Sequence, residues 1–253
     1  MPDTDSFLNN PVFVCLHYWA GSAREWDQVA AELAPEFKCL APDLGGFGVA
    51  AVPKGGHSIE AYTDSIAALI AEKQLTSFIL VGHSMGGKIA LNLAARHPAG
   101  LRGLVLLSPS PPTPEPMTDE DRTASLRAYG NATAALGTFT HITARPVSTE
   151  IRVQIIEDNL RSRREAWDAW LLHGSRENIT GHMCDIQVPC TILVGDADAV
   201  MSPSVHGLET LPYLPEGTHL EIISGAGHLL PYEAPQEVAA LLRKFGRRVE
   251  TPR

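Results

Sequence analysis

Residues 78–87 read Phe-Ile-Leu-Val-Gly-His-Ser-Met-Gly-Gly, and the predictions for the rest of the chain start from them. The apolar residues 78–81 are typical of a buried strand, and residues 84–97 have the pattern of a helix. Between them, residues 82–86 fit G-x-S-x-G, in which a serine lies on a sharp turn from a strand into a helix. Glycine on either side of Ser84 leaves room for that turn. The stretch therefore predicts that Ser84 is a nucleophile at the carboxyl edge of a sheet.

The pattern alone does not separate a nucleophile from a plain glycine-rich turn, since it arises by chance in roughly one chain in ten of this length. The residues that follow help to decide. Gly86, Ala90 and Ala94 recur at intervals of four and would let the helix lie close to the sheet. This stripe and the order strand, turn, helix favour the nucleophile.

Other apolar and amphipathic segments predict a sheet built around this strand. Further strands are expected at 11–17, 37–43, 104–107, 190–194 and 219–223. Helices are expected at 22–33, from Ser58 onward, within 149–172 and at 235–246. Ser22 and Glu25 have the spacing of a capping box at the start of the first of these helices. Strands that alternate with helices predict an α/β fold with a mostly parallel, doubly wound sheet.

The alternation stops after the strand at 104–107. Five prolines lie between residues 109 and 116, and only helix-like segments follow until Cys190 begins the next strand. Either half alone would leave an incomplete sheet. We therefore predict one α/β core made of residues 1–112 and 186–253, with a helical cap at 113–185 inserted between two strands.

A serine hydroxyl needs a base to remove its proton, and histidine suits this task at neutral pH. Among ten histidines, His228 follows the last predicted strand, so we expect it at the same sheet edge as Ser84. In this arrangement an acid lies between the two in chain order. Asp196 and Asp198 both follow the penultimate strand. We favour Asp198 as the residue that orients His228, and Asp196 then forms a turn.

Composition excludes several other classes of protein. The chain of 253 residues has a formal net charge of -9, whereas nucleic acid and anionic membranes attract clustered Lys and Arg. No apolar run approaches the ~20 residues of a membrane-spanning helix. Residues 1–6 lack the features of a secretory signal, and the four cysteines lack metal-ligand spacing. We expect a reduced cytoplasmic protein with no metal or organic cofactor and no nucleic-acid or membrane partner.

Taken together, these segments resemble the α/β-hydrolase superfamily, in its small capped branch of serine esterases, perhydrolases and lactonases. The matching pieces occur in the family's order at 17–22, 42–48, 82–86, 195–203 and 227–235. The backbone N–H of Met85 is one natural donor to an oxyanion, and the resemblance implies the N–H of Trp19 as the second. Two positions depart from the family, since Tyr18 replaces a usual glycine and Gly45 a usual arginine.

The resemblance implies acyl transfer, in which an ester, lactone or thioester acylates Ser84 and water then releases the acid. Apolar side chains of the cap segment, such as Trp167 and Trp170, indicate a small apolar substrate. The same scaffold hosts perhydrolases, carbon–carbon bond hydrolases and hydroxynitrile lyases. A ligand receptor with slow turnover is a further alternative.

Overall fold

Six strands form one sheet in the order β2-β1-β3-β4-β5-β6, and every neighbouring pair is parallel. The computed structural model describes residues 10–250, so the prediction about residues 1–6 lies outside the described part. The strands are β1 (Val12–Leu16), β2 (Cys39–Leu40), β3 (Phe78–His83), β4 (Leu101–Leu107), β5 (Cys190–Gly195) and β6 (His219–Ile223). The predicted α/β fold with a doubly wound parallel sheet is confirmed.

Strand β2 is much shorter than the strand predicted at 37–43. Only Cys39 and Leu40 pair with β1, opposite Phe13 and Val14. The strand lies at the edge of the sheet, and Pro42 has no N–H with which to continue a ladder. Apolar composition alone therefore overestimated the paired length.

Strand side chains alternate between two core layers, as the period of two requires. In β1, Val14 and Leu16 belong to one layer, while Phe13 and Cys15 belong to the other. The first layer contains α2 (Ile59–Glu72) and α3 (Met85–Ala94). The second contains α1 (Asp27–Leu33), part of α9 (Leu230–Glu233) and α10 (Pro235–Glu250).

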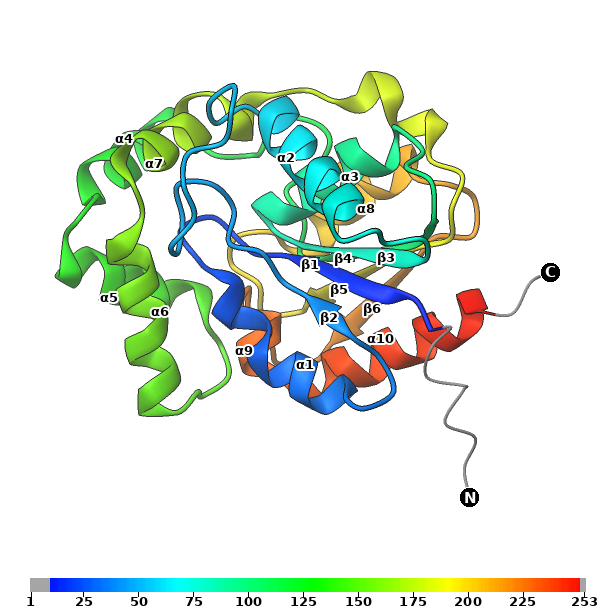
Figure 1. The fold of residues 1–253 in the computed structure, drawn as a ribbon. Coiled ribbons are helices and arrows are strands. Elements are labelled where there is room, and N and C mark those ends of the chain that lie inside the picture. The colour runs from blue at the N-terminus through cyan, green and yellow to red at the C-terminus, as the bar shows by residue number, and fades with distance from the viewer. Residues whose placement is uncertain (1–9, 251–253) are drawn as a thin grey trace.

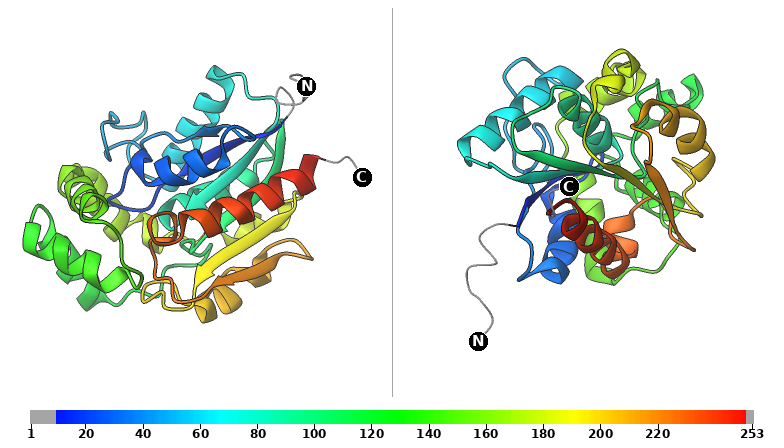
Figure 2. Two further views of the ribbon diagram at one scale, coloured as in Figure 1. Left: turned by 90° about the horizontal axis from the view of Figure 1, so that it is seen from below. Right: turned by 90° about the vertical axis from the view of Figure 1, so that its right-hand side faces the viewer.

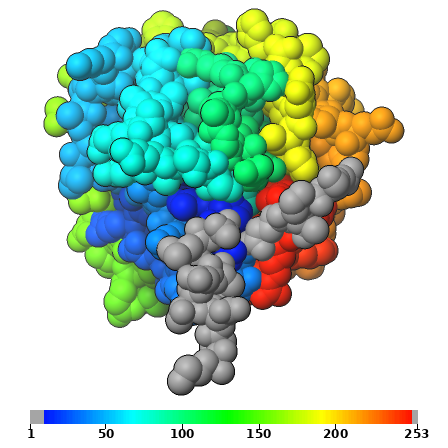
Figure 3. Space-filling model, turned by 45° about the vertical axis from the view of Figure 1, so that its right-hand side comes forward, coloured from blue at the N-terminus to red at the C-terminus, as the bar shows by residue number. Residues whose placement is uncertain are grey.

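The two helical layers lie on opposite sides of the sheet, as the ribbon views show (Figure 1, Figure 2). In the space-filling view the cyan surface of α2 lies above and the red surface of α10 below (Figure 3). Helix α8 (Pro203–Glu209) follows β5. Within residues 10–250, no helix combines the length and the apolar character needed to cross a membrane.

The segment between β4 and β5 is helical, and its residues 119–172 lie to the left of the sheet in Figure 1. It contains α4 (Asp119–Ala128), α5 (Ala132–Ile142), α6 (Thr149–Arg161) and α7 (Arg164–Leu172), then the 3₁₀ turns η3 (Gly174–Arg176) and η4 (Thr180–Asp185). The helical stretch expected at 149–172 is thus two helices. It breaks at Ser162, and the N–H of Arg163 donates to the Gly46 carbonyl at 2.8 Å instead of continuing the helix.

The predicted capping box is correct for Ser22, which is an N-cap, and wrong for Glu25, which does not cap. The Ser22 hydroxyl accepts from the N–H of Arg24 and begins a 3₁₀ turn, η2 (Ala23–Trp26), ahead of α1. The side chain of Glu25 turns inward and is almost completely buried. Its carboxylate has buried partners at Tyr18 and His83, described below, which the local pattern does not reveal.

Helix α3 lies directly against β1, and Gly86 makes this possible. All ten residues of the helix are buried. A Cβ atom on Gly86 would lie 2.4 Å from the Leu16 carbonyl oxygen and 2.7 Å from that of His17. The absence of a side chain at Gly86 therefore allows the start of α3 to lie in contact with the backbone at the end of β1.

Gly86→Ala is expected to lower the free energy of unfolding by about 3 kcal/mol or more, because the added methyl group meets rigid backbone and not a movable side chain. Urea denaturation followed by circular dichroism measures this change. Gly137→Ala within α5 is the matched control. A Cβ atom there has open space, so the control should raise stability by up to about 1 kcal/mol. Equal effects of the two variants would contradict the close approach.

Candidate active site

Ser84 lies at the tip of the turn between β3 and α3. Its backbone angles of φ 50° and ψ -116° are unfavourable for a residue that has a side chain. The turn is held from several sides. The Ser84 N–H donates to the Leu107 carbonyl at 3.0 Å, and its carbonyl accepts from Gly87 and Ser110 at 2.8 and 2.9 Å. The serine therefore occupies a strained but fixed position, with the amino end of α3 beside it.

His228 and Asp198 lie on loops that follow β6 and β5. His228 Nδ1 is 2.8 Å from Asp198 Oδ2, and both side chains are buried. The other carboxylate oxygen accepts from the N–H groups of Val200 and Met201, each at 2.8 Å. Because Nδ1 donates to the carboxylate, Nε2 of the neutral ring carries a free lone pair.

The pair shifts the pKa of both members. Burial alone would raise the pKa of Asp198, but the neighbouring His228 and the donated backbone N–H groups outweigh it and hold the pKa well below the ordinary value. Burial alone would lower the pKa of His228, and the charge and hydrogen bond of Asp198 more than offset it. His228 therefore binds a proton more readily than an ordinary histidine.

Activity is expected to fall as the pH falls through the pKa of His228, because only the neutral ring can accept a proton. That pKa is raised from 6.5, so the acid limb of kcat/KM should have its midpoint above pH 6.5. Asp198→Asn should move the midpoint to lower pH, since the charge that favours the protonated ring is removed. A profile of kcat/KM with a neutral ester measures both midpoints. A wild-type midpoint below 6.5 would contradict the expectation.

Asp196 is placed differently from Asp198. It is exposed, and its carboxylate accepts from the Gly225 N–H at 2.5 Å and from the Ser224 hydroxyl at 3.1 Å. These bonds join the loop after β5 to the loop after β6. The side chain that contacts the ring of His228 is that of Asp198.

The loop after β1 holds Tyr18 by both of its peptide groups. His17 Nδ1 lies 2.7 Å from the Tyr18 carbonyl, and His17 Nε2 accepts from the Leu44 N–H at 2.8 Å, so His17 is the neutral Nδ1–H tautomer. The N–H of Tyr18 donates to Glu25. Among the described turn and loop hydrogen bonds, none uses the N–H groups of Trp19 and Met85. Both can therefore donate to another acceptor.

Tyr18 replaces a usual glycine, yet its bulk fits. The ring occupies space over Gly21, where an added Cβ would lie 2.5 Å from it. Its centroid is 5.4 Å from that of His83. The tyrosine is therefore part of the packing beneath the site.

Glu25 and His83 make buried contacts around the site that no local sequence pattern predicts. His83 Nε2 lies 2.8 Å from the backbone carbonyl of His228, and His83 Nδ1 lies 3.3 Å from Glu25. His83 occupies a variable position of G-x-S-x-G. Glu25 has no sequence signal for this role, because 58 positions separate it from its partner.

A second carboxyl group near His228 also escaped the sequence analysis. Glu115 is buried, and burial raises its pKa although Ser110, Lys88 and His228 act in the opposite direction. Lys88 is itself buried, which lowers the pKa of its amine to about 8, and it donates to the Thr113 carbonyl at 3.0 Å. The segment after β4 thus contains, besides its prolines, a buried carboxyl group that interacts electrostatically with His228.

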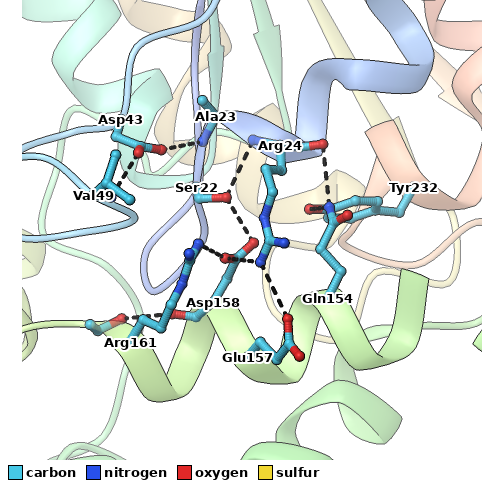
Figure 4. A network of polar contacts seen from close by, with 11 residues as sticks. Ser22, Ala23, Arg24, Asp43, Val49, Gln154, Glu157, Asp158, Arg161 and Tyr232 are labelled. Carbon is cyan, nitrogen blue, oxygen red and sulfur yellow. Dashed lines mark hydrogen bonds and ion pairs between the residues drawn. The ribbon is translucent and has the colours of Figure 1, made fainter. Parts of the chain in front are cut away.

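Helix α6 is joined to the loop after β1 through Asp158 (Figure 4). The buried carboxylate accepts from the Ser22 hydroxyl at 2.7 Å and from the Arg24 guanidinium at 2.5 Å, with Arg161 as a third partner. A buried charge is stable when such donors surround it. Helix α7 joins the same loop by an aromatic contact, since the ring centroids of Trp167 and Trp19 lie 4.2 Å apart with the rings tilted at 48°.

Glu233 joins the His228 loop to the linker between α5 and α6. One carboxylate oxygen accepts from the N–H groups of Ala144, Arg145 and Gly227 at 2.7–2.9 Å, and the other accepts from Leu229 at 3.0 Å. The N–H of His228 also donates to the Ile142 carbonyl at 2.8 Å. His228 therefore lies on a loop that the helical segment helps to hold. No cluster of side chains suited to a metal ion occurs within residues 10–250.

A family model described as the alpha/beta hydrolase fold matches residues 11–146, which is more than half of the chain. The chain belongs to the α/β-hydrolase fold family. The matched part of this α/β hydrolase includes Ser84, Met85 and the loop with Trp19. Asp198 and His228 lie beyond it.

Individual relatives of this α/β hydrolase are distant. An uncharacterized protein of Mycobacterium bovis is 31% identical over 100 residues, which make up 40% of this chain and only 29% of that protein. Lipase LipV of Mycobacterium tuberculosis is 28% identical over 251 residues, covering 90% of each chain. The esterase EaEST from Exiguobacterium antarcticum superposes with a TM-score of 0.87 at 18% identity, covering 94% of this chain and 92% of that one. The last likeness is one of fold.

Proposed function

We propose that this α/β hydrolase is a serine hydrolase that cleaves a carboxylic ester, lactone or thioester of a small molecule. The observation that carries the proposal is the 2.8 Å hydrogen bond between His228 and Asp198, at the sheet edge where the strained Ser84 lies. The name lipase of one similar protein supports the same class of reaction. Ser84 is the nucleophile, His228 the base and Asp198 the orienting acid.

Acylation uses the free lone pair of His228 Nε2. It accepts the proton of Ser84 Oγ as that oxygen attacks the carbonyl carbon of the substrate. The negative charge that develops on the carbonyl oxygen is stabilised by the N–H groups of Met85 and Trp19. The intermediate collapses, the bond to the leaving oxygen or sulfur breaks, and imidazolium protonates the leaving group.

Deacylation repeats these steps with water. His228 takes a proton from the water, the resulting hydroxide attacks the acyl carbon, and Ser84 leaves with the proton that His228 returns. Asp198 stabilises the imidazolium in both halves of the reaction. None of these steps requires a metal or an organic cofactor.

The substrate is proposed to carry a small apolar or aromatic group. Trp167 of α7 packs on Trp19 beside the proposed oxyanion donor, and the Tyr129 ring contacts Trp167 at 5.6 Å. This aromatic cluster lies against the loop that carries the proposed oxyanion donor.

A fluorophosphonate probe and a series of p-nitrophenyl esters test the proposal together. The probe should label one site per chain, and peptide mapping should place the label on Ser84. Esters of increasing acyl chain length should turn over continuously, with kcat/KM rising and then falling as the acyl group outgrows the pocket. Heat-denatured protein is the control for non-specific labelling.

Absence of labelling would contradict the proposed activation of Ser84. Labelling with a single burst of one acyl group and no further turnover would contradict a hydrolase and favour a receptor. Equal rates for short polar and long apolar esters would contradict the apolar substrate.

A further inference from the structure

Glu25 and His83 form a buried polar pair beneath the proposed catalytic residues. Their side chains have no exposure, and they lie on different elements, η2 and the end of β3. Nδ1 of His83 is 3.3 and 3.4 Å from the two carboxylate oxygens of Glu25. Nothing in the acyl-transfer chemistry uses either side chain directly. A buried charged or polar pair is costly to maintain unless each member has partners, so its other contacts matter.

Those other contacts lead to the two loops that carry the reacting groups. His83 Nε2 donates to the backbone carbonyl of His228 at 2.8 Å, and the two imidazole rings lie 5.1 Å apart. Glu25 accepts from the N–H of Tyr18 at 3.4 Å, directly before Trp19. The pair therefore spans from the base to the oxyanion loop.

The hydrogen-bond directions define where the protons lie. A carbonyl oxygen only accepts, so Nε2 of His83 must carry a proton. Nδ1 then shares one further proton with Glu25, which is held either as imidazolium beside a carboxylate or as a neutral ring beside a carboxylic acid. In both forms the pair donates to the carbonyl of His228 and accepts from Tyr18.

We infer that Glu25 and His83 are positioning residues that hold the His228 loop and the Trp19 loop at a fixed separation from Ser84. The inference rests on the proposed function, because the groups that the pair is inferred to position are the proposed catalytic groups. His83 also adjoins Ser84 in the chain. The pair is therefore connected to Ser84, to the His228 loop and to the Trp19 loop. A misplacement of about 1 Å in such a site can cost about 10²-fold in rate.

Substitutions at both positions test the inference. His83→Phe removes the donor to the His228 carbonyl and should lower kcat by about 10- to 100-fold with little change in KM. His83→Gln places an amide N–H near the position of Nε2 and should restore most of kcat. Glu25→Leu should resemble His83→Phe. Glu25→Gln can still accept from Tyr18 and donate to Nδ1 of a neutral His83, so it should stay within about threefold of the wild type.

His219→Phe, an exposed histidine at the start of β6, is the matched control and should leave kcat unchanged. Wild-type kcat in both His83→Phe and Glu25→Leu would overturn the inference. So would a Gln variant as impaired as its apolar counterpart, since that outcome would mean that hydrogen bonding at the position is not what matters. Thermal unfolding of each variant shows whether a fall in kcat comes from displaced loops or from a protein that no longer folds.

A second readout needs no substrate. The proton between His228 Nδ1 and Asp198 should give a low-field proton resonance in the wild type, and this signal should broaden or shift in His83→Phe but be retained in His83→Gln. An identical signal in all folded variants would overturn the inference even if the protein proves not to hydrolyse esters. If the wild-type protein does not turn over any ester, this result would instead contradict the proposed function.

Discussion

Replacing Ser84 with alanine is expected to lower kcat for ester hydrolysis about 10⁶-fold, to a rate set by the oxyanion donors and substrate binding alone. The change removes the only atom that the proposed mechanism bonds to substrate. Folding should be preserved, because alanine is smaller and no described hydrogen bond uses the Ser84 hydroxyl. Steady-state kinetics and fluorophosphonate labelling should both fall to background.

Ser204→Ala on α8 is the control for this variant, since its exposed hydroxyl bonds only to the neighbouring Ser202. It should keep wild-type kinetics. Turnover by Ser84→Ala within tenfold of the wild type would exclude the acyl-enzyme. Combining Ser84→Ala with Asp198→Asn should add little further loss, because residues of one catalytic unit act together.

Replacing Asp198 with asparagine is expected to lower kcat about 10⁴-fold, as the loss of the orienting carboxylate does in a serine triad. An amide can donate to His228 Nδ1 and so favour the tautomer with its proton on Nε2, the wrong one for a base. It also removes the charge that stabilises imidazolium. Measurements of kcat at pH values below and above the midpoint of the acid limb separate the effect of the wrong tautomer from that of the lost charge.

Asp196→Asn is a closely matched control, two residues away on the same loop. Asp196 bonds to Ser224 and Gly225 and makes no contact with the His228 ring. Its replacement should change kcat by less than about threefold and lower stability by about 1 kcal/mol through weakened loop contacts. The reverse ranking of the two variants would assign the acid to Asp196.

The fold was predictable because its signals are local. Most strands are short apolar runs, and the crossovers at 22–33, from Ser58 onward and at 84–97 have a helical period, so the parallel sheet followed from the residues themselves; α8, between β5 and β6, was not predicted. Ser84, Asp198 and His228 could be proposed because each follows a strand and parallel strands end at one edge. Their catalytic roles stay predictions.

The features that could not be predicted from the sequence depend on contacts between segments that are far apart in the chain. Glu25 looked like a capping residue because Ser22 precedes it by three, whereas its partner His83 is 58 positions away. The break at Ser162 arises because the Arg163 N–H meets the Gly46 carbonyl. Local propensity could not anticipate either, since tertiary partners override it.

Glu233 sets a condition for exchanging the helical segment between family members. Two of its four N–H partners, Ala144 and Arg145, belong to the transferred segment, while Gly227 and Leu229 stay behind. In a chimera whose new linker lacks these two donors, the buried carboxylate of Glu233 would lose two of its four hydrogen bonds close to His228. Successful grafts should therefore be those whose junctions preserve the backbone path at 144–145, whatever side chains they bring.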